Sequence, residues 1–384
     1  MIATRLRETR YWIERQERNQ QARFDSLLHR LESMAKSRND RDSLQRERLA
    51  KLAASRRAFT DETGKPRVIA FGADDWERYG LWPAMSRASN FTLWQYQNEV
   101  SALKTDDAYR KVVAQKFLQF VDQEDAKCPV TCVFFYAAGL HVSSELLSSL
   151  HARGIWTIIL GLDDKHQLSD PDGAVDGLSN QLRVALKCDL YWTTWKLAAD
   201  AINSAGGSAW FAPPGGDPEF FRPVQRAKDI DLVFVGSRYG HRGPLVNYLR
   251  SKGLKVDAYG RGWGQAPPDF ASTLDLFSRA RVVIGNGSVG YMNGVRHLKG
   301  RDFEVPMAGE VYLTTTNPEL SQFFSVGQEI LCYNSFADCA EIAHDILQQE
   351  SKARTIRQRA RERCVNDHTW DSRLSQLFSQ LTQV

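Results

Sequence analysis

Residues 229–244 read DIDLVFVGSRYGHRGP and contain, in one short stretch, a strand, a turn and the start of a helix. The apolar run ends at Gly236, and Pro244 stands where the first position of a helix over 243–252 is expected. A strand that turns directly into a helix is the repeating unit of a doubly wound α/β fold. The stretch therefore predicts a Rossmann-like domain built on a parallel sheet.

Strands and helices continue to alternate after this stretch. The expected elements are strands in KVDAYG (255–260), RVVIGNG (281–287) and EVYLTTT (310–316), and helices over 336–350 and 352–364. Together they predict a C-terminal domain over 229–368. Residues 369–384 then carry a last amphipathic helix.

A similar alternation precedes the stretch and predicts a second Rossmann-like domain over 61–212. The expected elements are strands in RVIAFGA (67–73), VTCVFFYAAG (130–139), GIWTIILGLDD (154–164) and CDLYWTTW (188–195), and helices over 106–121 and 143–152. The run Pro213-Pro214-Gly215-Gly216 interrupts both helix and strand, so residues 213–228 read as a linker. A length of 384 residues suits two such α/β domains and an extension.

Composition narrows the class of protein. A hydrophobic fraction of 42% and a charged fraction of 25% are ordinary for a globular chain. The longest apolar runs reach about half of a membrane span, and no signal-peptide pattern opens the sequence, so we expect a cytoplasmic protein. The six cysteines form no C-x-x-C pair, which favours reduced, packed thiols over a metal site, and no cofactor is expected.

The first 60 residues differ from the rest in charge. They carry 15 Lys and Arg against 8 Asp and Glu, and residues 1–58 contain no Gly or Pro, which favours helix. Ser37–Asp42 interrupts the pattern, so we expect two helices. The narrow apolar stripe from Phe24 to Met34 needs a partner: a sister chain, the chain's own body or an anionic membrane surface at the inner face. We rank self-association first, and no motif accompanies the charge to indicate nucleic-acid binding.

The turn after the first quoted strand has the chemistry of a phosphate site. Gly236 allows close approach, the helix that follows offers free backbone N–H groups, and Ser237, Arg238 and Arg242 add donors. The alternative is a plain strand-to-helix turn with surface arginines.

Two further segments add candidate ligand contacts. Asn286 opens a glycine-rich loop that matches neither a Walker loop nor a dinucleotide fingerprint, and it equally suits a flexible surface loop. In RDFEVPMAGEVYLTTTN, Arg301 and Glu304 share a helix face, and Thr315 ends the strand that follows. An arginine can hold a phosphate, and a carboxylate can accept two sugar hydroxyls, although the pair also suits a surface ion pair.

The C-terminal half resembles the CgeB-type spore-maturation glycosyltransferases. The resemblance rests on R-x-F-E-x-P-x-A-G followed by a Thr-rich strand, P-E-L-x-x-F-F, LCYNS and N-D-H-T-W-D-S-R-L, and it covers about 230–377. A looser likeness over 66–225 includes LGLDD and P-x-G-x-D-P-E-x-F-R-P. The resemblance implies a GT-B fold of two Rossmann-like domains and transfer of a sugar from a nucleoside diphosphate donor to a hydroxyl acceptor, such as a glycan.

The resemblance also implies roles for single residues. Glu304 would hold the ribose hydroxyls, and Arg301 and Arg242 would neutralise the diphosphate in the turn of Gly236 and Ser237. Tyr259 and Gly260 would lie beside the base. Related retaining families often carry a glutamate eight residues before the position of Glu304, whereas this chain has Arg296 there.

The N-terminal domain offers candidates for the acceptor side. His141 follows an apolar strand and a glycine, and Asp163 and Asp164 end another strand, where they serve either acceptor chemistry or a helix cap. Trp76, Tyr79 and Trp82 suit sugar stacking or simple core packing. Two rival functions stay open: a nucleotide-sugar epimerase of the same fold, and a non-catalytic scaffold that binds nucleotide sugars.

Overall fold

The computed structural model describes residues 10–36, 41–100, 107–136, 141–168 and 181–383. The chain divides into two compact units. The N-terminal unit comprises Phe24–Pro213 and Asp371–Val384, and the C-terminal unit comprises Pro214–Trp370 and Met1–Arg23. Among the described residues, no helix combines the length and the apolar character that crossing a membrane requires.

The N-terminal unit is built on a six-stranded sheet in the order β2-β1-β3-β4-β5-β6, in which all pairs are parallel. Its strands are β1 (Arg67–Gly72), β2 (Asn90–Gln95), β3 (Cys132–Phe135), β4 (Trp156–Gly161), β5 (Leu190–Thr193) and β6 (Ala209–Phe211). Its helices are α3 (Arg41–Ala53), η1 (Trp76–Tyr79), α4 (Leu81–Ala88), α5 (Tyr96–Val100), α6 (Asp107–Lys127), α7 (Ser144–Ala152), α8 (Asp164–Gln167), α9 (Gln181–Ala185), α10 (Lys196–Ser204) and most of α16 (Trp370–Thr382).

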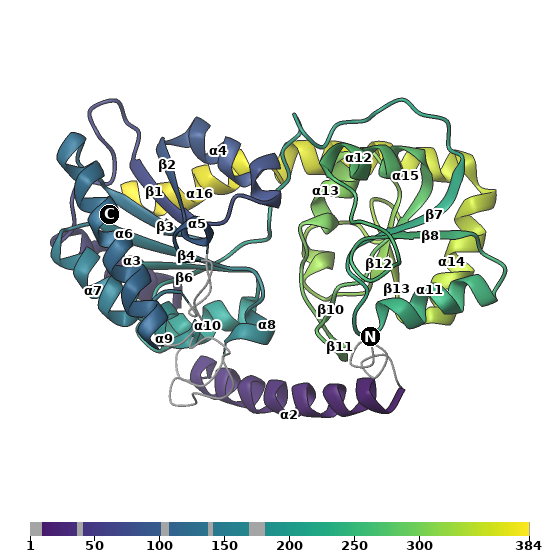
Figure 1. Ribbon diagram of the computed structural model, residues 1–384, viewed down its shortest axis with the longest axis horizontal. Helices are drawn as coiled ribbons and strands as arrows, with labels where there is room; N and C mark the ends of the chain where they lie inside the picture. The colour runs from purple at the N-terminus through teal and green to yellow at the C-terminus, as the bar shows by residue number, and fades with distance from the viewer. Residues whose placement is uncertain (1–9, 37–40, 101–106, 137–140, 169–180, 384) are drawn as a thin grey trace. The chain divides into compact units, whose positions relative to one another are not determined.

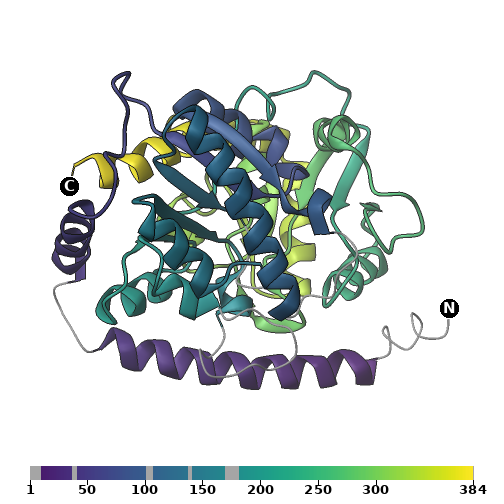
Figure 2. The ribbon, with the colours of Figure 1, turned by 60° about the vertical axis from the view of Figure 1, so that its left-hand side comes forward.

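Helices cover both faces of this sheet, as continuous apolar strands require. Side chains of α6, α7 and α10 form one core with Phe71, Phe135 and Tyr191 of the sheet, and α4 and α16 lie on the opposite face (Figures 1 and 2). Local signals fix the helix starts: Ser143, for example, accepts a hydrogen bond from the backbone N–H of Leu146 at 3.1 Å and caps α7.

The C-terminal unit repeats this plan on a five-stranded parallel sheet in the order β13-β12-β9-β7-β8. Its strands are β7 (Ile230–Val235), β8 (Val256–Tyr259), β9 (Ala280–Ile284), β12 (Tyr312–Thr315) and β13 (Leu331–Tyr333), with a separate hairpin of β10 (Ser288–Val289) and β11 (Met292–Arg296). Its helices are α11 (Arg242–Ser251), α12 (Phe270–Arg279), α13 (Arg301–Met307), η2 (Leu320–Gln322), α14 (Phe336–Gln348) and α15 (Glu350–Asp367).

Each sheet contains one point at which the strand order reverses. In the N-terminal unit the chain leaves β1 toward β2 and later returns on the other side as β3; in the C-terminal unit β7, β8 and β9 do the same. In open α/β sheets, ligands bind outside the carboxyl ends of the strands at such a switch point. The fold therefore marks one candidate site in each unit.

The expected linker over 213–228 makes specific contacts with the C-terminal unit. The backbone N–H of Gly216 donates to His368 O at 2.9 Å, and the side chain of Asp217 is fully buried. Pairing with the segment before α16 keeps this stretch ordered despite its prolines and glycines.

The arm forms α2 (Arg10–Ala35) and α3, and the interruption expected at Ser37–Asp42 falls partly on residues outside the described ranges. The apolar stripe of α2 is buried within the chain itself. Leu31 is completely buried, and Phe24 stacks on Trp195 with ring centroids 5.8 Å apart. The core of the N-terminal unit is thus a partner of this stripe, which agrees with the alternative that the arm packs on the chain's own body, and self-association through the arm stays a prediction.

Candidate donor and acceptor sites

The turn after β7 is held tightly against the end of β8. The backbone N–H of Gly236 donates to Tyr259 O at 2.8 Å, and Trp263 Nε1 donates to Gly236 O at 2.7 Å. Gly260 has a φ of +123°, and a methyl group added there would lie 2.5 Å from Gly236 O. Only glycine fits at this position, so Gly260 lets the two strand ends approach each other.

Two arginines converge on this turn from different elements. Arg242 begins α11, and Arg301 begins α13. Their Nη1 atoms lie 3.4 and 3.5 Å from the place where a methyl group on Gly236 would stand. Arg242 Nη1 donates to Ser237 O at 3.1 Å, and Arg301 Nη1 donates to Val235 O. The pair, distant in sequence, thus converges beside one glycine at the carboxyl end of β7.

Electrostatics at this pair favour an anionic ligand. Burial lowers the pKa of the Arg242 guanidinium from its ordinary value, and the neighbouring charge of Arg301 lowers it further, while Tyr239 opposes the change. The guanidinium lies over the rings of Tyr239, at 4.1 Å, and Phe234, at 5.9 Å. Two half-buried cations this close repel each other, and a bound phosphate would relieve that repulsion.

Helix α13 brings a carboxylate beside the arginine pair. Glu304 is 6% exposed, and its Oε1 lies 3.0 Å from where a methyl group on Gly300 would stand. Asp302 is buried more deeply: it accepts a hydrogen bond from the backbone N–H of Lys299 at 2.8 Å, and burial raises its pKa to about 7. Asp302 therefore organises the start of the helix, whereas Glu304 shares the first turn with Arg301.

The carboxyl ends of β9 and β12 meet in a network of short polar contacts. Asn286 Oδ1 accepts from the backbone N–H of Ser288 at 2.9 Å, and Thr315 Oγ1 accepts from the backbone N–H of Gly287 at 3.0 Å. Both side chains are largely buried. They hold the glycine-rich loop in one conformation, and the sheet brings them to the same edge as Gly236.

Arg238 occupies the outer side of the turn. Its guanidinium lies over the Trp263 ring at 5.4 Å, and its backbone N–H donates to Arg261 O at 2.8 Å. Ser237 is exposed and offers its hydroxyl next to this pair. Arg238 thus covers the loop after β8, whereas Arg242 and Arg301 converge beside Gly236.

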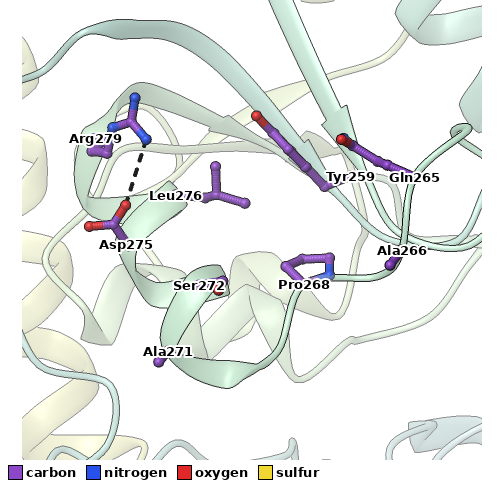
Figure 3. Close-up of a pocket in the computed structure, with 9 residues that line it drawn as sticks. All are labelled: Tyr259, Gln265, Ala266, Pro268, Ala271, Ser272, Asp275, Leu276 and Arg279. Atoms are coloured by element: carbon purple, nitrogen blue, oxygen red, sulfur yellow. Dashed lines mark ion pairs between the residues drawn. The ribbon is translucent and has the colours of Figure 1, made fainter.

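A cavity of about 530 Å³ opens between the edge strand β8 and α12 (Figure 3). Tyr259, Gln265 and Pro268 line its end near the carboxyl edge of the sheet. Leu276 and the ion pair between Asp275 and Arg279, 3.7 Å apart, line its other end. The ring of Tyr259 gives the first end a flat apolar surface of the kind that a planar ligand can stack on.

The switch point of the N-terminal unit has a different lining, centred on His141. The ring of Tyr96 lies 4.4 Å from the imidazole, and the hydroxyl of Tyr109 lies 2.7 Å from His141 Nδ1. Burial, together with the charge of Arg110, lowers the pKa of His141 to about 4. The imidazole is therefore neutral at pH 7 and acts there as a hydrogen-bonding group.

Sequence reasoning missed Glu77, which lies in η1 just after β1. Burial raises the pKa of its carboxyl, while a hydrogen bond with Tyr136 at the end of β3 acts in the opposite direction. Its charge also raises the pKa of Tyr96, which places it near the ring that faces His141. Nothing in the sequence around Glu77 distinguishes it from other glutamates. Its place in the site becomes clear only when the fold brings together the segments that follow β1, β2 and β3.

One of the three aromatic candidates is buried in the core, and the other two are partly exposed. Trp82 is 5% exposed and donates through Nε1 to Ala73 O at 2.9 Å, so it packs in the core. Trp76 and Tyr79 are half-buried, with ring centroids 5.9 Å apart. They flank Glu77 on the same short helix.

The two aspartates that follow β4, Asp163 and Asp164, differ in their exposure to solvent. Asp164 is completely buried, accepts hydrogen bonds from Tyr191 Oη at 2.5 Å and from Thr193 Oγ1, and has a pKa that burial raises to about 7. These contacts tie β4 to β5. Asp163 is half-buried and precedes α8 without a side-chain capping bond. Of these two aspartates, only Asp163 reaches the surface.

Across the described residues, no group of three or more His, Cys, Asp or Glu side chains could hold a metal ion.

Comparison with known proteins agrees with this architecture. A family described as glycosyl transferase-like matches residues 218–379, most of the C-terminal unit. No curated protein matches the sequence. Among solved structures, a sucrose-phosphate synthase from Thermosynechococcus elongatus has a TM-score of 0.58 at 14% identity, covering 83% of this chain and 99% of that chain.

Two more structures align over similar lengths. Anabaena Alr3699/HepE in complex with UDP and glucose has a TM-score of 0.56 at 10% identity, covering 83% of this chain and 100% of that one. A putative UDP-N-acetylglucosamine 2-epimerase from Listeria monocytogenes has a TM-score of 0.53 at 10% identity, covering 83% and 96%. The fold is the predicted GT-B fold. The family match over residues 218–379 agrees with the predicted glycosyltransferase activity.

Proposed function

We propose that the chain is a glycosyltransferase that moves a sugar from a nucleoside diphosphate donor to a hydroxyl group of an acceptor, and that the C-terminal unit binds the donor. The observation that carries the proposal is the pair of guanidinium groups, Arg242 and Arg301, that converge beside Gly236. Backbone N–H groups at the start of α11 and the two arginines offer a diphosphate both donors and positive charge.

The neighbouring residues suit the rest of the donor. Glu304 would accept the ribose hydroxyls, since its carboxylate shares the first turn of α13 with Arg301. The base would stack on Tyr259 at the near end of the cavity, with Gly260 allowing its close approach. Asn286 and Thr315 would line the sugar side through the loop that they organise.

The remaining donor candidates would act at the outside of the turn. Ser237 would donate its hydroxyl to a phosphate oxygen, since it follows Gly236 directly. Arg238 would close the loop after β8 over the nucleotide through its contact with Trp263.

The acceptor would bind at the switch point of the N-terminal unit. Glu77 and His141 would accept and donate hydrogen bonds to acceptor hydroxyls there, and Tyr96 would offer a ring for stacking. Asp163 is a second surface carboxylate at the neighbouring strand end, while Asp164 would support that edge from the interior.

The chemistry of transfer then follows from charge. As the bond between the anomeric carbon and the diphosphate breaks, negative charge grows on the leaving oxygen, and the two arginines balance it. The resemblance to CgeB-type and retaining families favours retention of the anomeric configuration. An inverting enzyme would need a general base on the acceptor side, for which Glu77 and His141 at the switch point of the N-terminal unit are candidates beside Asp163. Proton NMR of the product linkage distinguishes the two outcomes.

The epimerase is the second candidate, because a putative UDP-N-acetylglucosamine 2-epimerase shares the fold over most of the chain. Incubation of the full chain with nucleotide sugars separates the two functions. A transferase releases free nucleoside diphosphate as the sugar passes to an acceptor hydroxyl or, without an acceptor, to water. An epimerase returns an isomer of the nucleotide sugar with no diphosphate released.

A thermal-shift and calorimetry series on UDP, GDP, ADP and dTDP tests the donor site directly, because a ligand that binds only the folded chain raises its melting temperature. We expect one of these nucleotides to stabilise the chain, and Arg301→Gln to abolish most of that shift. The matched control is Arg281→Gln. Arg281 lies 3.5 Å from Asp231 near the amino end of β9, whereas the proposed site lies at the carboxyl ends of the strands. If no nucleotide binds, or if both variants lose binding equally, the proposal is wrong.

A further inference from the structure

The first half of the arm helix α2 is bonded to the hairpin of β10 and β11. The residues of α2 up to Arg23 belong to the C-terminal unit, and they lie beside this hairpin (Figure 1). Gln20 Oε1 accepts a hydrogen bond from the backbone N–H of Tyr291, at the tip of the hairpin, at 2.8 Å. A segment outside the glycosyl transferase-like match over 218–379 is therefore bonded to a loop inside it.

The hairpin tip also binds the turn that leads into α11. His241 Nε2 donates to Tyr291 O at 2.9 Å, and the ring nitrogen must carry the hydrogen because a carbonyl oxygen only accepts. The carboxylate of Glu17 on α2 lies 3.9 Å from the same nitrogen. Tyr291 is thus bonded through its N–H to α2 and through its carbonyl to the residue that precedes Arg242.

Two glycines allow these three segments to lie in direct contact. Gly240 and Gly290 both have a φ of +55°. A methyl group on Gly240 would lie 2.5 Å from Gly290 O, a backbone atom that could move only together with the hairpin tip. A methyl group on Gly290 would meet Gln20 Oε1, which could move aside only by giving up its bond to Tyr291. A side chain at either position would therefore separate α2, the tip and the turn.

The hairpin and the turn both continue into the proposed donor site. The hairpin extends from the loop that Asn286 and Thr315 hold at the carboxyl ends of β9 and β12. The turn leads into Arg242, whose guanidinium lies beside Gly236. The position of the hairpin tip therefore affects both the loop on the sugar side and the start of α11 on the diphosphate side.

We propose that Gln20 is a positioning residue of the donor site. By binding the N–H of Tyr291, Gln20 holds the hairpin tip against His241 and so keeps the loop after β9 and the start of α11 in the arrangement that binds the donor. Gln20 acts through the hairpin and not through a contact of its own with the donor. This inference rests on the proposed donor site and adds a function for the first half of α2.

Calorimetry on the full chain tests the inference with the nucleotide of the UDP, GDP, ADP and dTDP series that the wild-type chain binds. Gln20→Met keeps the length of the side chain and removes the acceptor, so it is expected to weaken binding about three- to tenfold, the effect of one lost hydrogen bond. Gln20→Glu keeps an acceptor oxygen and should stay within about twofold of the wild type. Gln16→Met is the matched control, because it makes the same substitution one turn earlier in α2.

A double-variant cycle shows whether the two bonds to Tyr291 act together. His241→Leu removes the donor to Tyr291 O, whereas His241→Gln keeps a donating N–H group. If both bonds act through the hairpin tip, the chain with Gln20→Met and His241→Leu should lose little more affinity than the weaker-binding single variant.

Hydrogen exchange over residues 288–296 gives a second readout. In the free chain this segment should exchange faster in Gln20→Met than in the wild type, because the N–H of Tyr291 loses its acceptor. Bound nucleotide should restore the protection.

The possible failures are distinct. Unchanged affinity in Gln20→Met, together with the expected loss in Arg301→Gln, overturns the inference while the donor site stands. Equal losses in Gln20→Met and Gln16→Met, no recovery in Gln20→Glu, or additive losses in the double variant also overturn it, because Gln20 then does not act through the hairpin tip. A lower melting temperature with unchanged affinity shows that the arm contributes stability alone. If no nucleotide binds the wild-type chain, the proposed function fails, and the inference fails with it.

Discussion

The two switch points have the same backbone plan and opposite side-chain chemistry. In the C-terminal unit the strand ends carry Gly236 and Gly260, with Arg242 and Arg301 beside the first. In the N-terminal unit the corresponding strand ends carry rings, a carboxylate and a neutral imidazole. The sheet thus determines where a ligand binds, and the residues just after each strand determine its charge.

This difference suits a two-substrate reaction. Glycine allows a group such as a diphosphate to approach the backbone closely, and arginine neutralises its negative charge. Rings and a carboxylate suit a polyhydroxylated group, which needs stacking and hydrogen bonds rather than charge balance.

Removing one arginine from the C-terminal site should have the largest effect. Arg301→Gln or Arg242→Gln is expected to weaken binding of the nucleoside diphosphate about ten- to hundredfold, because each loses a charge-assisted hydrogen bond worth about 1.5–3 kcal/mol. Calorimetry measures the loss. An affinity within twofold of the wild type in either folded variant would break the contrast on the donor side.

Neutralising the carboxylate of the N-terminal site should affect only the acceptor. Glu77→Gln is expected to raise the acceptor KM about tenfold through one lost charge-assisted hydrogen bond, with nucleotide affinity unchanged. Steady-state kinetics at saturating donor and calorimetry with the free nucleotide provide the two readouts. Weaker nucleotide binding in this variant would show that the two units do not divide the substrates in this way.

Removing the ring beside the cavity should have a moderate effect on the nucleotide. Tyr259→Ala is expected to weaken nucleotide binding about two- to tenfold, because a stacked ring contributes about 0.5–1.5 kcal/mol beyond its buried area. Tyr259→Phe serves as the control, since it keeps the ring. If Tyr259→Phe loses as much affinity as Tyr259→Ala, the hydroxyl and not the ring carries the contact.

The smallest effect on substrates is expected at the buried aspartate. Burial raises the pKa of Asp164 to about 7 in the folded chain, against an ordinary value of 3.8. Between these values the folded chain holds a proton that the unfolded chain releases, so this group's contribution to stability falls as the pH rises from about 4 to 7. Asp164→Asn should flatten this pH dependence in denaturant titrations and leave the acceptor KM unchanged. A changed acceptor KM in a stable Asp164→Asn chain would place acceptor chemistry at β4.

Much of the fold can be predicted from the sequence, because the signals for strands and turns are local. The run ending at Gly236 and the glycine at 260 identify the ends of β7 and β8, and sheet topology then brings Arg242 toward them. Asn286 and Thr315 follow from the same reasoning, since each stands at the end of a strand or just after it.

The surroundings of several side chains could not be predicted from the sequence, because their partners lie far away in the chain. Asp164 reads as a surface carboxylate at a strand end, but Tyr191 and Thr193 of the next strand enclose it. Glu77 carries no local signal, because its partner Tyr136 follows β3, far along the chain. The stripe of α2 likewise reads as unpartnered until Trp195, far along the chain, covers Phe24.

The most direct test of the account is a crystal structure of the full chain with the nucleoside diphosphate that it binds best. We expect the diphosphate at the turn of Gly236, with the guanidinium groups of Arg242 and Arg301 about 2.7–2.9 Å from its oxygens, the distance of a charge-assisted hydrogen bond. A diphosphate bound elsewhere, with both arginines still donating to the carbonyls of Ser237 and Val235, would contradict it.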